Sequence, residues 1–209
     1  MWVKICGITR REDAELAAEL RAAAVGFVFW PGSRRFIEPT AAADIARGLP
    51  APVTPVGVFV DQPVEYVNAV VQEVGLGAVQ LHGAETAEYC AQITAPVIKA
   101  VPVGSGFRMT AVTGLPAGVT VLVDVDDPVA RGGTGRPVDW AAARKVARVR
   151  RIILAGGLTP ENVGAAIRAV EPGGVDVSSG VESEPGIKDP HRLRRFFQAV
   201  HSAAGGGRA

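Results

Sequence analysis

Short apolar runs alternate with longer segments of helical periodicity along the whole chain. Most of these runs are continuously hydrophobic, which is typical of strands covered on both faces, as in a parallel sheet. The runs number eight and lie at residues 2–6, 25–30, 53–60, 78–81, 96–101, 119–125, 151–155 and 175–179. Eight strand–helix units within about 200 residues predict a minimal (β/α)8 TIM barrel, a fold of the α/β class.

The rival architecture is an open, doubly wound sheet, which would usually place fewer strands in a chain of this length. No internal repeat, linker or second domain is visible in the pattern. We therefore predict a single barrel domain over residues 1–200. The last segment, residues 201–209, is rich in glycine and alanine and has the composition of a flexible tail.

Helix starts are predicted between the apolar runs. The spacing Thr9-x-x-Glu12 is a capping-box pattern ahead of an apolar helical segment. Proline fits the first helical position because its missing N–H costs nothing there. Three prolines stand at such positions: Pro63, Pro160 and Pro190. Thr159 and Asp189 precede two of them as candidate N-caps, and Asp139 opens a further helical segment.

Composition narrows the class of protein. The chain has 209 residues, of which 48% are hydrophobic and 21% charged, and its net charge is +1. This balance gives no reason to expect nucleic acid or a membrane surface as partner, whereas small anions can bind through local groups. Two cysteines and no signal-peptide pattern argue against a disulfide-stapled secreted domain. No apolar run reaches the roughly 18 residues of a membrane span, so we expect a soluble cytoplasmic protein.

Residues that close the apolar runs are the candidate active-site residues, because the active sites of TIM barrels lie at the C-terminal ends of the strands. Cys6 closes the first run and precedes a glycine; the alternative is a buried small hydrophobe, as most free cysteines are. Asp124 closes the sixth run, where a buried carboxylate is costly unless it is used or paired; the alternative is a turn-capping aspartate. Cys90 stands in a helical segment and is expected to be structural.

Polar residues also follow the second and fourth runs. Arg34 and Arg35 are either a solvated loop pair or include a guanidinium that grips a ligand carboxylate through two parallel hydrogen bonds. Gln80 and His82 close the fourth run. The other two histidines stand in the last helical segment, so a metal site is not expected. His82 is therefore either a binding group or a satisfied polar residue at the barrel rim.

Small-residue loops follow three of the later runs. The glycines of residues 132–135 are a weak signal, because any flexible loop has this composition. Phosphate in TIM barrels is frequently held after strands seven and eight. Here these loops contain Gly156 and Gly157, and then Ser178, Ser179 and Gly180. Backbone N–H groups in such loops can hold an anion without a lysine, so we predict a phosphate site there.

In this order the segments resemble the phosphoribosylanthranilate isomerase family of tryptophan biosynthesis, which belongs to the ribulose-phosphate-binding barrels. The resemblance runs from Lys4 to about Phe197. Single motifs such as GGTG carry little of it, whereas the ordered set is specific. The matching segments are KICG (4–7), GFVFWPGSRR (26–35), VGVFV (56–60), QLHG (80–83), VLVD (121–124), GGTGRPVDW (132–140), LAGGLTPENV (154–163), GVDVSSGVE (174–182) and GIKD (186–189).

The resemblance implies an Amadori rearrangement of N-(5-phosphoribosyl)anthranilate to the carboxyphenylamino-deoxyribulose phosphate. It implies catalytic roles for Cys6 and Asp124, and carboxylate binding by Arg35, which we favour over Arg34 by register. Where many members have Ser-Pro-Arg, this chain has an arginine before Arg35. Further substrate-binding residues implied are Gln80, His82 and Asp176. The implied phosphate-binding residues are Gly156, Gly157, Ser179 and Gly180.

The implied mechanism needs one acid and one base. Asp124 as general acid must hold a proton near neutral pH, which desolvation favours. Cys6 as general base must form a thiolate, so we expect its pKa to lie below the ordinary value of about 8.5. No cofactor and no metal are expected, because the substrate's own amine supplies the electron sink.

Two other functions stay open at this point. A histidine-pathway or dual-specificity aminoaldose isomerase performs the same rearrangement on a substrate with two phosphates. That reading implies an aspartate in place of Cys6 and a second phosphate loop, for which residues 29–33 are a poor candidate. A non-catalytic sugar-phosphate-binding barrel would be expected to lack the acid or the base. The pattern allows a monomer or a homodimer.

Overall fold

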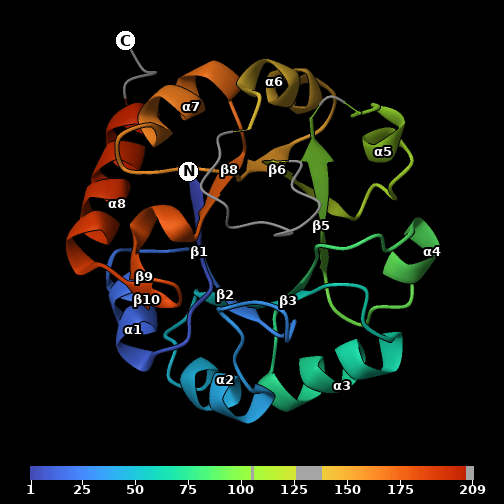
Figure 1. Cartoon of the computed structure of the whole chain (residues 1–209), viewed down its shortest axis with the longest axis vertical. Coiled ribbons are helices and arrows are strands. Elements are labelled where there is room, and N and C mark those ends of the chain that lie inside the picture. The colour runs from blue at the N-terminus through green and yellow to red at the C-terminus, as the bar shows by residue number, and fades with distance from the viewer. Residues whose placement is uncertain (105, 126–137, 206–209) are drawn as a thin grey trace.

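The computed structural model describes residues 1–104, 106–125 and 138–205. Its centre is a closed barrel of parallel strands that neighbour one another in chain order, with β8 pairing back onto β1 (Figure 1). The strands are β1 (Trp2–Cys6), β2 (Ala24–Val28), β3 (Thr54–Phe59), β4 (Ala78–Leu81), β5 (Val97–Val103), β6 (Thr120–Val125), β7 (Ile152–Leu154) and β8 (Gly174–Val177). Each overlaps a predicted apolar run, and the predicted TIM barrel is confirmed.

The helices form a ring around the barrel (Figure 1). They are α1 (Arg11–Glu19), α2 (Pro39–Ala46), α3 (Val64–Val74), α4 (Ala87–Cys90), α5 (Thr110–Thr113), α6 (Trp140–Val149), α7 (Val163–Val170) and α8 (Pro190–Gly205). Two of them, α4 and α5, are only four residues long. Within the described ranges, no helix combines the length and apolar character that crossing a membrane requires.

Two of the predicted helix starts are confirmed. Helix α8 begins at Pro190, and Asp189 Oδ1 accepts hydrogen bonds from the backbone N–H groups two and three residues later, at 2.8 and 3.0 Å. Asp139 caps α6 in the same way. In both cases a carboxylate oxygen satisfies N–H groups that have no partner within the first helical turn.

The capping box predicted at Thr9 is wrong. Helix α1 begins at Arg11, and its N-cap, Arg10, makes no side-chain cap hydrogen bond. The Thr9 hydroxyl instead donates to the carbonyl oxygen of Gly186, which is 2.5 Å away but 177 residues later in the sequence. The Thr9 side chain therefore forms a long-range hydrogen bond instead of the local cap that the sequence pattern predicts.

Two prolines precede their helices instead of occupying the first helical position. Pro63 is the N-cap of α3, which begins one residue later. Pro160 lies within a turn ahead of α7, which begins only at Val163. In that turn the Thr159 hydroxyl accepts from the N–H of Glu161 at 3.2 Å. The side-chain oxygen of Asn162 accepts from the N–H of Thr159 at 2.8 Å. The side chains of Thr159 and Asn162 therefore order the turn before the helix starts.

The segment after β8 contains elements that the apolar pattern did not predict. A single 3-10 turn, η1 (Ser179–Val181), leads into a small antiparallel hairpin of β9 (Glu182–Glu184) and β10 (Ile187–Lys188). Helix α8 then continues to Gly205, five residues into the segment expected to be a tail. Alanine is the best helix former, and Ala203 packs against the core, which explains the longer helix. Residues 206–209 lie outside the described residues.

The barrel interior is layered. It is filled by an apolar cluster that reaches the cavity at Ala155 and consists of Ala24, Val56, Ala78, Ile98, Ala100, Leu122, Ile153 and Ala155. Side chains two residues apart on a strand share a face. The next inward positions are therefore Gln80 after Ala78 and Asp124 after Leu122, and both are buried. This change from apolar to polar places the chemistry at the C-terminal ends of the strands.

Candidate active site

A cavity of about 320 Å³ opens at the C-terminal ends of the strands. Its walls bring together most of the residues predicted from the sequence: Cys6, Arg35, Gln80, His82, Asp124, Gly156, Gly157, Asp176 and Ser179. Gly180 lies behind this lining, in η1. The weak candidate loop at residues 132–135 lies outside the described residues. Residues from distant parts of the sequence thus converge on one pocket.

Cys6 lies beside a buried ion pair. Lys4 and Asp176 are register partners on the adjacent strands β1 and β8, and Lys4 Nζ lies 2.9 Å from Asp176 Oδ2. Lys4 is fully buried. A Cβ placed on Gly26 would lie 2.9 Å from Cys6 Sγ and 3.0 Å from Lys4 Cε, so thiol and ammonium chain flank the same glycine. The charge of Lys4 therefore acts on the Cys6 side chain.

The expected low pKa of Cys6 is wrong for this structure. Burial raises the pKa of the Cys6 thiol, because a thiolate loses its hydration there. The charge of Lys4 opposes this rise, whereas the Asp176 carboxylate adds to it. Burial likewise raises the pKa of Asp176 against the attraction of Lys4. The desolvation of the thiolate therefore affects the pKa of Cys6 more than the charge of Lys4 does.

Asp124 is held by contacts on both oxygens. Its Oδ1 accepts a hydrogen bond from the N–H of Val125 at 2.7 Å, and its Oδ2 lies 3.4 Å from His82 Nε2. The other ring nitrogen, His82 Nδ1, lies 3.1 Å from the Nε2 of Gln80. The amide nitrogen can only donate, so Nδ1 accepts and the ring proton sits on Nε2, facing the carboxylate. Gln80 and His82 thus orient Asp124 toward the cavity.

Two buried acceptor atoms in the pocket walls have no hydrogen-bond partner in the described part of the chain. They are Gln80 Oε1 and Asp176 Oδ1. A buried acceptor left unpaired costs roughly 1–3 kcal/mol. Both residues line the cavity, so a ligand that carries hydroxyl groups would remove this cost by donating to them.

The two arginines behave differently. Arg34 is exposed, whereas the Arg35 side chain retains only 12% of its exposure. The Arg35 guanidinium forms a two-pronged ion pair with Glu182, with Nε–Oε1 at 2.9 Å and Nη2–Oε2 at 2.7 Å. The buried Glu182 carboxylate also accepts from Lys188 Nζ at 2.7 Å. Burial, opposed more strongly by these two cations, leaves the pKa of Glu182 below its ordinary value.

The loops after β7 and β8 form one continuous wall. Gly156 and Gly157 both have positive φ, +81° and +62°, so their conformation favours glycine. A Cβ on Gly180 would lie 1.9 Å from the carbonyl oxygen of Leu158, so the second loop packs directly on the first. Neither residues 155–160 nor 177–181 contain a lysine or arginine. An anion in this wall would therefore be held by backbone N–H groups and serine hydroxyls.

Sequence reasoning gave no role to three buried charged residues of this region: Lys4, Glu182 and Lys188. For Lys4 a signal was present, because a residue two positions before Cys6 on one strand shares its face. Glu182 and Lys188 occur in the segments GVDVSSGVE and GIKD. Their meeting with Arg35 depends on the hairpin of β9 and β10, which the apolar pattern did not predict.

Comparison with known proteins gives consistent matches over nearly the whole chain. The sequence model of the family described as N-(5'phosphoribosyl)anthranilate (PRA) isomerase matches residues 3–199. A protein of Pelobacter propionicus named N-(5'-phosphoribosyl)anthranilate isomerase is 46% identical over 196 residues, which cover 94% of this chain and 93% of that protein.

Solved structures agree. A phosphoribosyl anthranilate isomerase from Thermus thermophilus is 43% identical, with a TM-score of 0.88 over 97% of this chain and 99% of that one. A second such isomerase, solved in complex with reduced 1-(o-carboxyphenylamino)-1-deoxyribulose 5-phosphate, is 42% identical, with a TM-score of 0.84 and the same coverage. Sequence and fold are therefore similar to one group of proteins from end to end.

Replacing Lys4 should make the Cys6 thiol still harder to ionise. In a Cys90→Ala background, Lys4→Met removes the main group that lowers the pKa of Cys6. A higher pKa means that the thiolate forms only at more alkaline pH. The pH profile of Cys6 alkylation by iodoacetamide should therefore move upward by about one pH unit or more. The exposed Lys145→Met variant should leave the profile in place. A profile unchanged or shifted downward in Lys4→Met would contradict this account.

Gly156→Ala should cost more stability than backbone strain alone. A Cβ there would lie 2.8 Å from Asp124 Oδ1 and 3.0 Å from the nitrogen of Val125. Gly75 is a matched control, because its φ is +72° and nothing lies within 4 Å of its added Cβ. Gly75→Ala should lose about 1–2 kcal/mol of unfolding free energy from strain. Urea unfolding should show a larger loss for Gly156→Ala; equal losses would mean that Gly156 does not contact Asp124 tightly.

Proposed function

The chain belongs to the N-(5'-phosphoribosyl)anthranilate isomerase family, and on that basis we propose how its residues perform the reaction. It is an isomerase of tryptophan biosynthesis that converts N-(5-phosphoribosyl)anthranilate into 1-(2-carboxyphenylamino)-1-deoxyribulose 5-phosphate. One observation supports the residue assignments above all others. A single cavity is lined by a thiol, a carboxyl group, an arginine and a wall of backbone donors.

Asp124 is the general acid of this proposal. It protonates the furanose ring oxygen, the bond from that oxygen to C1 breaks, and the amine nitrogen donates its electron pair to form the iminium ion. The contacts of Asp124 with Val125 and His82 fix the direction of the carboxyl group. A positioned acid of this kind typically contributes about 10² to 10⁴ to the rate.

Cys6 is the general base. Its thiolate removes the proton from C2 of the open-chain sugar, and the C–H electron pair forms the enolamine as the iminium nitrogen takes up its electrons. The enolamine then tautomerises to the ketone. Cys6 and Asp124 lie on β1 and β6, which are not neighbours in the barrel, so they address the substrate from different sides. Lys4 supplies the positive charge next to the thiolate.

The two ends of the substrate bind at different parts of the cavity rim. We assign the anthranilate carboxylate to Arg35, after β2, and the phosphate to the wall formed by Gly156, Gly157, Ser179 and Gly180. Such binding at both ends holds the sugar between acid and base, which lowers the entropic barrier. Gly180 contributes through its close packing on Leu158 rather than from the cavity surface.

The sugar hydroxyls are assigned to the unpaired acceptors. Asp176 Oδ1 and Gln80 Oε1 are buried and lie in the cavity walls, so each can accept a hydrogen bond from a hydroxyl. His82 is assigned to substrate binding through its position beside Asp124. This accounts for all substrate-binding residues predicted from the sequence.

The reaction is proposed to need no metal or cofactor, because the substrate nitrogen itself accepts the electrons released from C2. The histidine-pathway alternative is disfavoured by the family match and by Cys6 in place of an aspartate. We also propose that the protein acts in the cytoplasm, as a monomer or homodimer, without nucleic acid or membrane partners. The balanced net charge of +1 supports the last point.

Cys6→Ala and Asp124→Asn should each lower kcat by about two to four orders of magnitude, because each removes one half of the acid–base pair. Binding of a product analogue should change little. Cys90→Ala is the matched control, since this second buried cysteine lies on α4 outside the cavity, and its turnover should stay close to that of the parent. Steady-state kinetics with the natural substrate measure all three. Near-parental kcat in either active-site variant would refute that residue's assignment.

Arg35→Ala should raise KM far more than Arg34→Ala. Losing a charge-assisted partner costs about 1.5–3 kcal/mol, equivalent to roughly tenfold or more in affinity. Arg34 is exposed and should matter less. Initial-rate measurements over a range of substrate concentrations decide between them. The opposite ranking would show that the register of this loop has been assigned one residue out.

A further inference from the structure

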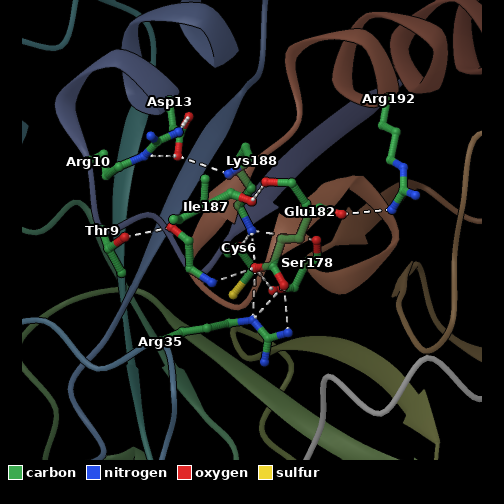
Figure 2. A network of polar contacts seen from close by, with 12 residues as sticks. Cys6, Thr9, Arg10, Asp13, Arg35, Ser178, Glu182, Ile187, Lys188 and Arg192 are labelled. Carbon is green, nitrogen blue, oxygen red and sulfur yellow. Dashed lines mark hydrogen bonds and ion pairs between the residues drawn. The ribbon is translucent and has the colours of Figure 1, made fainter.

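The proposed carboxylate-binding arginine belongs to a largely buried cluster of charges. It consists of Arg35, Glu182 and Lys188, with side-chain exposures of 12%, 4% and 0%. Figure 2 shows that the cluster joins the loop after β2 to the hairpin of β9 and β10. Glu182 and Lys188 are absent from the cavity lining, so they can influence a ligand only through other residues.

Glu182 occupies one particular edge of the Arg35 guanidinium. Its carboxylate accepts from Nε at 2.9 Å and from Nη2 at 2.7 Å, which is the side-on arrangement. A guanidinium has five N–H donors in a fixed plane. The side-on pair uses two of them and leaves the end-on edge, formed by Nη1 and the second Nη2 hydrogen, for another carboxylate. Arg35 itself lines the cavity.

The Glu182 carboxylate is in turn fixed from behind. Lys188 Nζ donates to Glu182 Oε1 at 2.7 Å, and the N–H of Gly186 donates to the same oxygen at 3.3 Å. Lys188 Nζ also donates to the carbonyl oxygen of Cys6 at 2.6 Å. The lysine therefore balances the buried charge of Glu182 and ties the hairpin to the strand end that carries the thiol.

In the described part of the chain, the side-chain hydrogen bonds of the Arg35 guanidinium all go to Glu182, so this carboxylate sets its orientation. Arginine loses rotamer entropy when its side chain is fixed, so an untethered guanidinium binds a carboxylate less tightly. A guanidinium whose plane is already set by a buried partner has lost this freedom before the ligand arrives. Recognition of a planar aromatic carboxylate depends on such a fixed plane.

We propose that Glu182, with its charge balanced by Lys188, is a positioning residue that aims the end-on edge of Arg35 at the carboxylate of the substrate. The inference rests on the proposed role of Arg35 and extends it, because it assigns the specificity for a carboxylated aromatic amine to a residue that the ligand does not touch. It also explains why a glutamate next to the binding arginine does not exclude the ligand's carboxylate: the two use different edges of one guanidinium.

The test compares two substrates that differ only in the carboxylate: N-(5-phosphoribosyl)anthranilate and N-(5-phosphoribosyl)aniline. Glu182→Gln should raise KM for the carboxylated substrate by about fivefold to tenfold, with kcat changed far less, because a uniform binding contact is weakened. With the aniline substrate the same variant should have a KM close to that of the parent. A purely structural role for Glu182 would raise KM or lower kcat for both substrates alike.

Glu182→Asp guards against loss of folding in the first variant. It keeps the negative charge that Lys188 requires, but the shorter side chain cannot span the side-on edge of Arg35. We expect a folded protein with the same carboxylate-dependent rise in KM. Glu171→Gln is the matched control, since Glu171 forms a comparable 2.8 Å pair with Arg144 on the exposed surface, and it should change neither substrate.

Arg35→Ala separates failure of this inference from failure of the proposed function. If Arg35→Ala shows no carboxylate-dependent effect, the assignment of Arg35 itself is wrong. If Arg35→Ala shows the effect but both Glu182 variants affect the two substrates equally or not at all, Glu182 is not a positioning residue. Adding Glu182→Gln to Arg35→Ala should cause no further carboxylate-dependent loss, whereas additive losses would overturn the proposed coupling.

Discussion

Closure of the parallel barrel is the constraint on which the rest of this structure depends. Because β8 pairs back onto β1, the inward side chains of all strands share one narrow, largely buried interior. Apolar residues fill the part of this interior that lies below the cavity. A charged group placed above them is costly unless it pairs with another inward side chain. Lys4 and Asp176 meet for this reason, as register partners on the two strands that close the ring.

The same constraint explains why charges around the cavity occur in compensated groups. Lys4 pairs with Asp176, and Glu182 is shared between Arg35 and Lys188. Removing one member of such a group leaves a buried charge, which costs more than the pair contributes. The hairpin of β9 and β10 extends this network beyond the barrel and connects three rim segments, those after β1, β2 and β8 (Figure 2). The hairpin thereby ties these three segments to one another.

The sequence predicted those features that depend on one element at a time. Each strand was visible as an apolar run, and Cys6 and Asp124 stood out because they interrupt such runs at their ends. Asp189 and Asp139 were readable as caps because their partners are two and three residues away. The capping box predicted at Thr9 was wrong because the actual partner of Thr9, Gly186, is distant in the chain. The prediction of a low pKa for Cys6 was wrong because the burial of a side chain, unlike a neighbouring charge, cannot be inferred from adjacent residues.

The raised pKa of Cys6 bears on how the proposed base can work. A base of higher pKa is present in its active form less often at neutral pH, but it removes a proton more strongly once formed. Proton abstraction from carbon needs that strength. Lys4 partly offsets the cost of forming the thiolate, while the desolvated surroundings keep the thiolate basic. Asp176 keeps Lys4 charged, because together with Cys6 it raises the pKa of the buried ammonium against the effect of burial. The ion pair on β1 and β8 therefore sets the balance between how often the base forms and how strongly it acts.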